Sequence, residues 1–326
     1  MKIIIPAAGV GTRLRPHTYS EPKALLNVAG KSILGHILDN LIPLRPTEVI
    51  FVIGFLGQKI IDFVKKDYKF KTNFVEQKRL WGLGHAIYLT RNFISQEPIL
   101  IILGDTIIDS DLKFVKKSKY NLLGTCEVAD PRRFGIAEVQ NGRVKKLTEK
   151  PKRPKGNLAL VGAYYIKDTS LFKQCLKEIV EKRHRNKGEF QLTDVLQKMI
   201  ERKAKFKTFK VQGWHDCGKI ETLLETNRHL LMKNYDSPGL KNFRGSLILP
   251  PVFISPKAQV ENSVVGPFAT IAERASVKNS VIFDSIVNEN SQVLHTILNA
   301  QVVKKNGKVN ENSWHFEYLQ YGVTKA

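Results

Sequence analysis

The fold is decided by the stretch Ile3-Ile4-Ile5-Pro6-Ala7-Ala8-Gly9-Val10-Gly11-Thr12-Arg13-Leu14-Arg15-Pro16. Its apolar beginning predicts a buried strand over Ile3–Ala7, and the two glycines after it predict a tight turn at the carboxyl end of that strand. Because glycine has no Cβ, the backbone N–H groups of such a turn can approach an anion closely. The motif is neither a Walker loop, which needs Gly-Lys-Ser/Thr, nor a dinucleotide fingerprint, whose glycine spacing differs. The stretch therefore predicts an anion-binding loop at the edge of a sheet.

Apolar runs and helical patterns alternate over the first two thirds of the chain. Further strands are expected at Glu48–Ile53, Asn73–Gln77 and Ile99–Leu103, with amphipathic helices between them. This alternation predicts an α/β fold: a Rossmann-like mixed, mainly parallel sheet with helices on both faces. The later segments are expected to be strands at 123–129, 135–139, 143–149 and 159–166, which form an inserted lobe over the sheet edge, and helices at 170–184, 191–202 and 218–233.

The pattern changes after about Pro238. From Pro251 onward an aliphatic residue recurs every five or six positions, and alternation with a period of two is absent. This spacing predicts a short left-handed parallel β-helix of roughly three coils, rather than ordinary antiparallel strands. We therefore expect two domains, 1–238 and 245–326, the second holding the β-helix and a C-terminal tail. The recurring residues are Ile254, Val260, Val265, Ile271, Val277, Ile282, Val287, Val293 and Leu298.

The charge is unusual, with 52 Lys+Arg against 30 Asp+Glu, a formal net charge of +22. A nucleic-acid binder, a protein that handles polyanionic small molecules and a lysine-rich solvated surface would all show such an excess. A basic stripe with interleaved aromatic residues is missing, so neither nucleic acid nor a membrane is expected as a partner, and the solvated surface is favoured. The three cysteines have no metal-ligand spacing, which favours reduced thiols and a cytoplasmic location.

Two cations and two carboxylates could act on a triphosphate. Arg13 follows the glycine turn directly and Lys23 lies ten residues further on, and splitting a triphosphate requires fixed positive charge at the attacked and departing phosphates. Asp105 comes where an apolar strand ends, the position at which α/β sheets place ligands. Asp105 and Asp216 offer the oxygen ligands that Mg²⁺ prefers. Either aspartate alone could equally cap a helix or form a turn, but together with Lys23 and Arg13 a metal–nucleotide site is favoured.

These motifs resemble those of the sugar-phosphate nucleotidylyltransferases, the pyrophosphorylases that make nucleotide sugars. The resemblance rests on Gly9-x-Gly11-Thr12-Arg13-Leu14-x-Pro16 with Pro22-Lys23, and it extends to about residue 233. The chain has Ala8-Gly9 where the family has Gly-Gly, as its uridylyltransferase branch also does, and Cys217 where small or hydroxyl residues are common. The further matching motifs are Gln77, Gly82-Leu83-Gly84-His85-Ala86, Leu103-Gly104-Asp105, Phe134-Gly135, Glu149-Lys150-Pro151, Gly162, Gly188-Glu189, Thr193-Asp194 and Trp214-x-Asp216-x-Gly218.

The resemblance implies a role for each matching residue. Ala8, Gly9, Gly11 and Thr12 would hold the nucleotide. Arg13 would grip the β- and γ-phosphates, and Lys23 would neutralise charge at the α-phosphate. Gln77 would read the base, with Gly82 leaving room for the ring. Asp105 and Asp216 would hold Mg²⁺. Glu149 would bind sugar hydroxyls and Lys150 the sugar's phosphate, with Gly135 and Gly162 lining the sugar pocket.

The implied reaction joins a nucleoside triphosphate (NTP) and a sugar 1-phosphate to give an NDP-sugar and pyrophosphate. Gln77 with the motif at 82–86 resembles the pyrimidine-using branches, so dTTP or UTP with glucose 1-phosphate is expected. Mannose-1-phosphate guanylyl transfer, a bifunctional protein with an acyl-CoA-dependent β-helix, and a non-catalytic regulatory subunit are the alternatives. The attacking phosphate oxygen is already ionised, so His17, His36 and His85 are not needed for catalysis. Residues 245–326 are expected to make a homo-oligomer.

Overall fold

The computed structural model describes residues 1–234 and 243–310. The chain divides into two compact units, one made of Met1–Leu26 with Lys31–Thr222 and the other of Asn27–Gly30 with Leu223–Ala326. The change of pattern at Pro238 and the part of the predicted C-terminal tail after residue 310 lie outside the described residues. Among the described helices, none has the length and apolar character required to cross a membrane.

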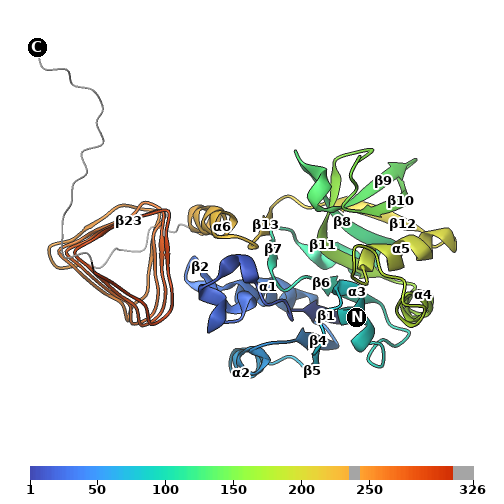
Figure 1. Cartoon of the computed structure of the whole chain (residues 1–326), viewed down its shortest axis with the longest axis horizontal. Coiled ribbons are helices and arrows are strands. Elements are labelled where there is room, and N and C mark those ends of the chain that lie inside the picture. Colours follow the sequence, from blue (N-terminus) through green and yellow to red (C-terminus); the bar gives the residue numbers. More distant parts are fainter. Residues whose placement is uncertain (235–242, 311–326) are drawn as a thin grey trace, which may run out of the picture. The chain divides into compact units, whose positions relative to one another are not determined.

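A nine-stranded sheet forms the centre of the first unit, with the order β10-β9-β11-β6-β1-β4-β5 (Figure 1). In addition, β8 pairs with β11, and β12 pairs with β8. Its central part, β6-β1-β4-β5, is parallel. The predicted mixed α/β sheet is thus confirmed. The strands are β1 (Lys2–Pro6), β4 (Glu48–Ile53), β5 (Thr72–Glu76), β6 (Ile99–Ile102), β8 (Asn121–Glu127), β9 (Gly135–Gln140), β10 (Arg143–Glu149), β11 (Leu158–Ile166) and β12 (Phe206–Lys210).

The strands expected to form a separate inserted lobe instead continue this sheet. The reason is β11, a nine-residue strand that is buried over almost its whole length. Its second half pairs antiparallel with β6, its first half contacts β9, and β8 pairs with both halves. The register shifts between Leu160 and Tyr164, where Gly162 adopts a φ of +85° that a side chain would strain.

Helices cover both faces of the sheet. On one face, α3 (Leu83–Leu89), α4 (Thr169–Glu181) and α5 (Leu192–Glu201) share a hydrophobic core with Ile50 and Val52 of β4. Since side chains alternate along a strand, Ile53 points to the opposite face. There α2 (Gly57–Asp67) packs so closely that a Cβ on Gly57 would lie 2.9 Å from Ile53 Cδ1. The remaining helices are α1 (Ile33–Leu41) and α6 (Ile220–Lys233).

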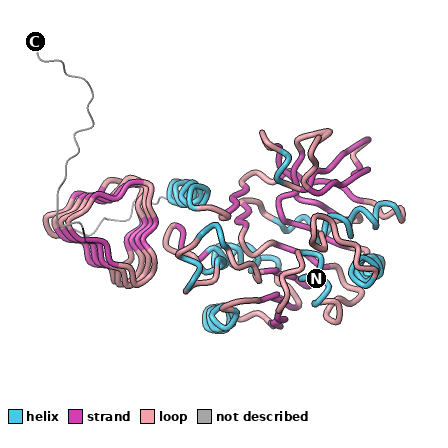
Figure 2. Tube along the Cα trace, in the orientation of Figure 1, coloured by secondary structure: helices cyan, strands magenta, loops and turns pink. Residues whose placement is uncertain are grey.

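The second unit contains three four-stranded parallel sheets stacked as a β-helix, consistent with the left-handed coil that the hexad pattern predicts. Figure 1 shows its triangular coils, and Figure 2 shows that they consist of strand and loop. In the described residues there are four coils rather than three, because the repeat extends past the predicted run at both ends: β14 precedes Pro251, and β24 and β25 follow Leu298. The strands are β14 (Leu247–Ile248), β15 (Phe253–Ile254), β16 (Gln259–Glu261), β17 (Val264–Val265), β18 (Thr270–Ile271), β19 (Ser276–Lys278), β20 (Val281–Phe283), β21 (Ile286–Val287), β22 (Gln292–Leu294), β23 (Ile297–Asn299), β24 (Val302–Val303) and β25 (Lys308–Asn310).

The recurring aliphatic residues point inward, as predicted. Val265, Ile271 and Ile282 are fully buried in one core that runs along the coils. The residue before each inward position on the first sheet is also aliphatic, and the parallel register aligns Leu247, Val264, Val281 and Ile297. Leu247 and Ile297 remain exposed. The described part of this sheet therefore has an outward-facing row of aliphatic side chains, which we call the outer aliphatic row.

Asn227 on α6 is the main polar connection inside the second unit. It is fully buried, and its Oδ1 accepts hydrogen bonds from Ala29 N at 2.8 Å and Thr270 Oγ1 at 2.7 Å. Its Nδ2 donates to Phe268 O at 3.0 Å. One amide therefore satisfies three polar groups from two segments, the loop at Ala29 and the chain at Phe268–Thr270.

We expect Asn227→Ala to destabilise the second unit by about 3 kcal/mol, because each buried polar group left without a partner costs about 1–3 kcal/mol. Scanning calorimetry of the full chain measures this change. The exposed residue Asn299 offers a matched control, and Asn299→Ala should change stability by less than about 0.5 kcal/mol. Equal stability of the two variants would contradict this role of Asn227.

Candidate active site

The two glycines of the turn after β1 have different surroundings: Gly11 is closely packed and Gly9 is not. Gly11 has a φ of +67°, and a Cβ there would lie 3.0 Å from Thr18 Cγ2 and 3.1 Å from Lys23 Cβ. A side chain at Gly11 would therefore meet both strain and close contacts. At Gly9, by contrast, a Cβ would have no atom within 4 Å. The backbone of Gly9 thus faces open space.

This open space is a cavity of about 300 Å³. Six residues predicted from the sequence line it, namely Ala8, Gly9, Lys23, Gln77, Gly82 and Asp105. Thr12, in contrast, is exposed on the short turn that follows Gly11. The cavity is completed by Pro6, Ala7, Ala24, Leu80, Leu83, Ala86, Leu103, Gly104 and Glu189.

An ion pair between Lys23 and Asp105 lies at this cavity. Lys23 is only 9% exposed, and its Nζ donates to Asp105 Oδ2 at 2.6 Å. Asp105 is held in place because Gly104 N donates to Pro6 O at 3.1 Å. A Cβ on Gly104 would lie 2.9 Å from the Cβ of Ala7, so the close approach of the two chain segments requires a glycine there. The ends of the adjacent strands β1 and β6 thereby place the pair.

Asp216 joins this pair from the ladder of β7 (Thr106–Ile108) and β13 (Trp214–Asp216), in which it lies opposite Thr106. Burial raises the pKa of the Asp216 carboxyl, and the negative charge of Asp105 raises it further. The charges of Lys23 and Arg13 act in the opposite direction. Asp105, Lys23 and Arg13 are therefore all near enough to Asp216 to affect its pKa.

Gly218 gives Arg13 its access to this group. A Cβ on Gly218 would lie 3.0 Å from Arg13 Nη2 and 2.9 Å from Asp216 Oδ1. Arg133, which the sequence analysis did not single out, also lowers the pKa of Asp216. Its only signal in the sequence is its place just before the motif Phe134-Gly135. The candidate site therefore holds one more cation than predicted.

Of the four residues predicted to bind the sugar phosphate, Gly135, Glu149 and Lys150 lie at the ends of β9 and β10, and Gly162 lies in the middle of β11. Thr193 Oγ1 donates to Glu149 Oε2 at 2.6 Å, and Lys150 Nζ lies 3.6 Å from Glu149 Oε1. A Cβ on Gly135 would lie 3.1 Å from Glu149 Oε2, and Gly162 lies against Leu103. Thr193 belongs to a quoted motif, but the sequence assigned it no role.

Tyr164 connects this group to the aspartate site. Burial raises the pKa of its hydroxyl, and the charges of both Glu149 and Asp105 raise it further. The phenol therefore stays protonated near both carboxylates. No sequence pattern pointed to Tyr164, because it reads as one more apolar residue of a buried strand.

Gln77 and Gly82 meet at the other side of the cavity. Gly82 has a φ of +97°, and a Cβ there would lie 2.7 Å from Phe190 O. Gln77 Nε2 donates to Gly82 O at 3.2 Å and lies 3.1 Å from His85 Nδ1. His85 was not expected in catalysis, and it contacts Gln77 beneath the cavity surface. The two predicted base-binding residues thus share a local hydrogen-bond network.

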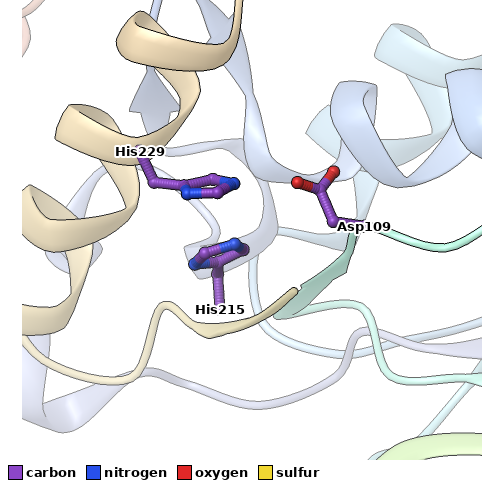
Figure 3. A group of neighbouring side chains, drawn as sticks. All are labelled: Asp109, His215 and His229. Atoms are coloured by element: carbon purple, nitrogen blue, oxygen red, sulfur yellow. The ribbon is translucent and has the colours of Figure 1, made fainter. Parts of the chain in front are cut away.

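A further pair of polar side chains lies at the other end of the β7–β13 ladder. Figure 3 shows Asp109, just after β7, and His215 of β13; the third residue drawn, His229, belongs to the second unit. Asp109 N donates to Gly213 O at 2.8 Å. A Cβ on Gly213 would lie 3.2 Å from both Asp109 Oδ2 and His215 Nε2. Gly213 therefore leaves the space that these two side chains occupy.

Comparison with known proteins identifies the family. Residues 2–233 match the sequence model of the family described as Nucleotidyl transferase. A glucose-1-phosphate thymidylyltransferase from Streptomyces griseus is 32% identical over 314 residues, which cover 88% of this chain and 87% of that protein. The bifunctional protein GlmU of Methanocaldococcus jannaschii is 35% identical over 243 residues, 73% of this chain and 57% of that protein.

The fold agrees with these matches. A solved structure of UDP-glucose pyrophosphorylase complexed with UDP-glucose superposes with a TM-score of 0.63 at 26% identity, over 72% of this chain and 99% of that one. Two lines of comparison, one from sequence and one from structure, thus agree with the site geometry. The chain belongs to the nucleotidyl transferase family, and it is an enzyme that transfers a nucleotidyl group to a sugar phosphate.

Proposed function

We propose that the enzyme joins UTP or dTTP to glucose 1-phosphate, releasing pyrophosphate in a Mg²⁺-dependent reaction. The observation that carries this proposal is the cavity at which Lys23, Asp105 and the open glycine turn meet Gln77. A phosphate oxygen of the sugar phosphate attacks the α-phosphorus, and the bond from this phosphorus to the bridging oxygen of pyrophosphate breaks. The attacking oxygen is already ionised, and the electron pair of the broken bond leaves on the pyrophosphate oxygen, so no proton has to be removed and the step needs no general base.

Charge neutralisation is the main task of the site, because two polyanions must meet. At about 4 Å and an effective dielectric near 20, each pair of unit charges interacts by about 4 kcal/mol. Lys23 would neutralise charge at the α-phosphate, and Arg13 would hold the β- and γ-phosphates. The backbone around Ala8, Gly9 and Gly11, with Thr12 after it, would hold the rest of the triphosphate. Positioning and neutralisation together account for catalysis of phosphoryl-type transfer.

The carboxylates of Asp105 and Asp216 fit a magnesium ion. Each raises the energetic cost of ionising the other, as the raised pKa of Asp216 indicates, and a divalent cation relieves that repulsion. One or two carboxylates completed by substrate phosphates are the usual ligand set of Mg²⁺. When bound, the ion would neutralise phosphate charge and orient the triphosphate. Asp105 would then exchange its ion pair with Lys23 for the metal, which leaves Lys23 available to the α-phosphate.

The sugar phosphate would bind at the ends of β9 and β10 and beside the middle of β11. Glu149, held by the hydroxyl of Thr193, would accept hydrogen bonds from sugar hydroxyls, and Lys150 would bind the sugar's phosphate. Gly135 and Gly162 would leave room for the ring. The choice of glucose and of a pyrimidine nucleotide is supported by the names of similar proteins, which include a glucose-1-phosphate thymidylyltransferase and a UDP-glucose pyrophosphorylase.

Three other functions deserve comparison. Mannose-1-phosphate guanylyl transfer would use the same chemistry with another base and sugar. A second, acyl-transfer activity of the β-helix is disfavoured, because the described β-helix is short, with four coils. A non-catalytic regulatory role is disfavoured, because Arg13, Lys23, Asp105 and Asp216 are all present and close together. The expected cytoplasmic location stays a prediction.

A substrate matrix tests the proposal. The full chain is incubated with each of five NTPs and several sugar 1-phosphates, and pyrophosphate release is measured. We expect UTP or dTTP with glucose 1-phosphate to give the highest kcat/KM. Highest activity with GTP and mannose 1-phosphate would replace the proposed substrates, and pyrophosphate release with none of the pairs would contradict catalysis.

Lys23→Ala should lower kcat by about 100-fold or more with a smaller effect on KM for the NTP, because the cation acts mainly in the transition state. Steady-state kinetics with the preferred pair measure this. Lys65→Ala removes an exposed lysine of α2 and should leave turnover unchanged. Unchanged turnover in Lys23→Ala would remove Lys23 from the mechanism.

Asp105→Asn and Asp216→Asn should each abolish activity at ordinary Mg²⁺ concentrations while the circular dichroism spectrum stays the same. The amide keeps the volume of the carboxylate but loses the charge that binds the cation. Asp67→Asn, at an exposed position on α2, is the control and should retain activity. Full activity with an unchanged Mg²⁺ requirement in either site variant would show that this residue is not a ligand.

We also propose that the C-terminal unit makes a homo-oligomer, with the outer aliphatic row as its contact. Exposed aliphatic side chains aligned by strand register can pair with the same row of a second copy. The double variant Leu247→Lys/Ile297→Lys should therefore lower the mass measured by light scattering after size exclusion. The control Gln259→Lys/Gln292→Lys, on another sheet of the β-helix, should keep the mass. A monomeric native protein, or equal masses in both variants, would contradict the proposal.

A further inference from the structure

The amide of Gln77 is held in one orientation by two neighbours. Its Nε2 lies 3.2 Å from Gly82 O and 3.1 Å from His85 Nδ1. A carbonyl oxygen only accepts hydrogen bonds, so the Gln77 atom beside it must be the NH₂ group. The second hydrogen of that group then points at His85 Nδ1, which must carry a lone pair. Both hydrogens of the amide are thereby used within the protein.

The surroundings of His85 favour a neutral imidazole, which has a lone pair on one ring nitrogen. Its side chain is 8% exposed, and burial lowers the pKa of the imidazole, with the charge of Arg185 lowering it further. The ring lies edge to face against Trp81, with centroids 5.1 Å apart. The backbone of Arg79 acts in the opposite direction to burial and raises the pKa. With Nδ1 accepting from Gln77, a neutral ring must carry its proton on Nε2.

We propose that His85 is a positioning residue that fixes the orientation of the Gln77 amide. In this orientation the Oε1 of Gln77, which can only accept hydrogen bonds, faces the cavity. The site then selects nucleotides whose base carries a ring N–H. The inference rests on the proposed role of Gln77 as the reader of the base. Gln77 is among the residues that line the cavity. Among the residues that the structure describes, none donates a hydrogen bond to its Oε1.

The selection follows from the ring nitrogens of the bases. Uracil and thymine carry N3–H, a donor that matches Oε1. Cytosine has a lone pair on N3 at the same place, so that two acceptors would face each other. The same contrast separates guanine, with N1–H, from adenine, with a lone pair on N1. With the wrong base the site loses a hydrogen bond and keeps an unpaired buried polar group. Such a loss can lower kcat/KM for the wrong nucleotide by up to about 10⁴-fold.

Turning the amide would reverse this preference, and His85 and Gly82 O together prevent the turn. Without an acceptor at Nδ1, only the 3.2 Å hydrogen bond to Gly82 O holds the amide, so the Gln77 side chain rotates by half a turn more readily and offers Nε2 to the base. A donor would then face the base, which favours cytosine. An asparagine at position 85 places its Oδ1 close to the position of Nδ1 and can restore the acceptor, whereas leucine cannot.

The test compares His85→Leu with the conservative variant His85→Asn in the full chain. The measured quantity is the ratio of kcat/KM for UTP to that for CTP, from pyrophosphate release with glucose 1-phosphate. We expect His85→Leu to lower this ratio by about tenfold or more, through a higher KM for UTP, and His85→Asn to stay within about threefold of the native protein. An unchanged ratio in His85→Leu, or an equal fall in both variants, would overturn the proposal.

Failure of the proposed substrates would be seen separately. If the native protein prefers GTP, the assignment to UTP or dTTP is wrong. The role of His85 can then be tested with the ratio of kcat/KM for GTP to that for ATP, because guanine also presents a ring N–H and adenine does not. A native protein that does not discriminate within either pair would overturn the inference about His85.

A second measurement does not depend on activity or on the folding of variants. The ¹⁵N chemical shifts of the His85 ring in the ligand-free protein report its tautomer. We expect a neutral ring protonated at Nε2. Protonation at Nδ1, in a neutral or a charged ring, would contradict the proposal, because Nδ1 could not then accept from Gln77.

Discussion

The ion pair between Lys23 and Asp105 is the interaction on which the active-site geometry depends. A lysine only 9% exposed needs a negative partner, because an unpaired buried charge is costly. The partner is available only because two neighbouring parallel strands, β1 and β6, end at the same edge. Gly104 and Gly11 then permit the close approach of backbone that brings the two residues within 2.6 Å. In the proposed mechanism the two charges neutralise each other until substrate phosphate replaces Asp105 as the partner of Lys23 and a cation replaces Lys23 as the partner of Asp105.

The need to hold a few cations in fixed positions also explains how a chain with a net charge of +22 can act on particular anionic substrates. Most of the lysines and arginines lie on the surface, where solvent and salt screen them. Arg13, Lys23 and Arg133 are set apart by their effect on one carboxylate, because each lowers the pKa of Asp216. The overall charge can attract anionic substrates, but in the proposed mechanism the reaction depends on the few cations near this carboxylate.

The sequence predicted those parts of the structure that follow from local patterns. The hexad spacing identified Val265, Ile271 and Ile282 as core residues of the β-helix, because each coil repeats the same inward position. Strand ends predicted that Asp105 would lie near the glycine turn. The lobe was predicted wrongly, since nothing in the local pattern of β11 shows that its second half pairs with β6, its first half with β9 and both halves with β8. Tyr164 and the bond from Thr193 to Glu149 were missed for the same reason, because they depend on contacts between distant segments.

The most direct test of the account is the effect of Mg²⁺ on nucleotide binding by the native full chain. Isothermal titration with UTP, in the presence and absence of Mg²⁺ and at fixed ionic strength, measures this effect. If Asp105 and Asp216 hold the cation that the triphosphate shares, UTP should bind at least about tenfold more tightly with Mg²⁺, which corresponds to about 1.4 kcal/mol. Equal affinity under both conditions would contradict the claim that these two carboxylates and the nucleotide phosphates share one metal.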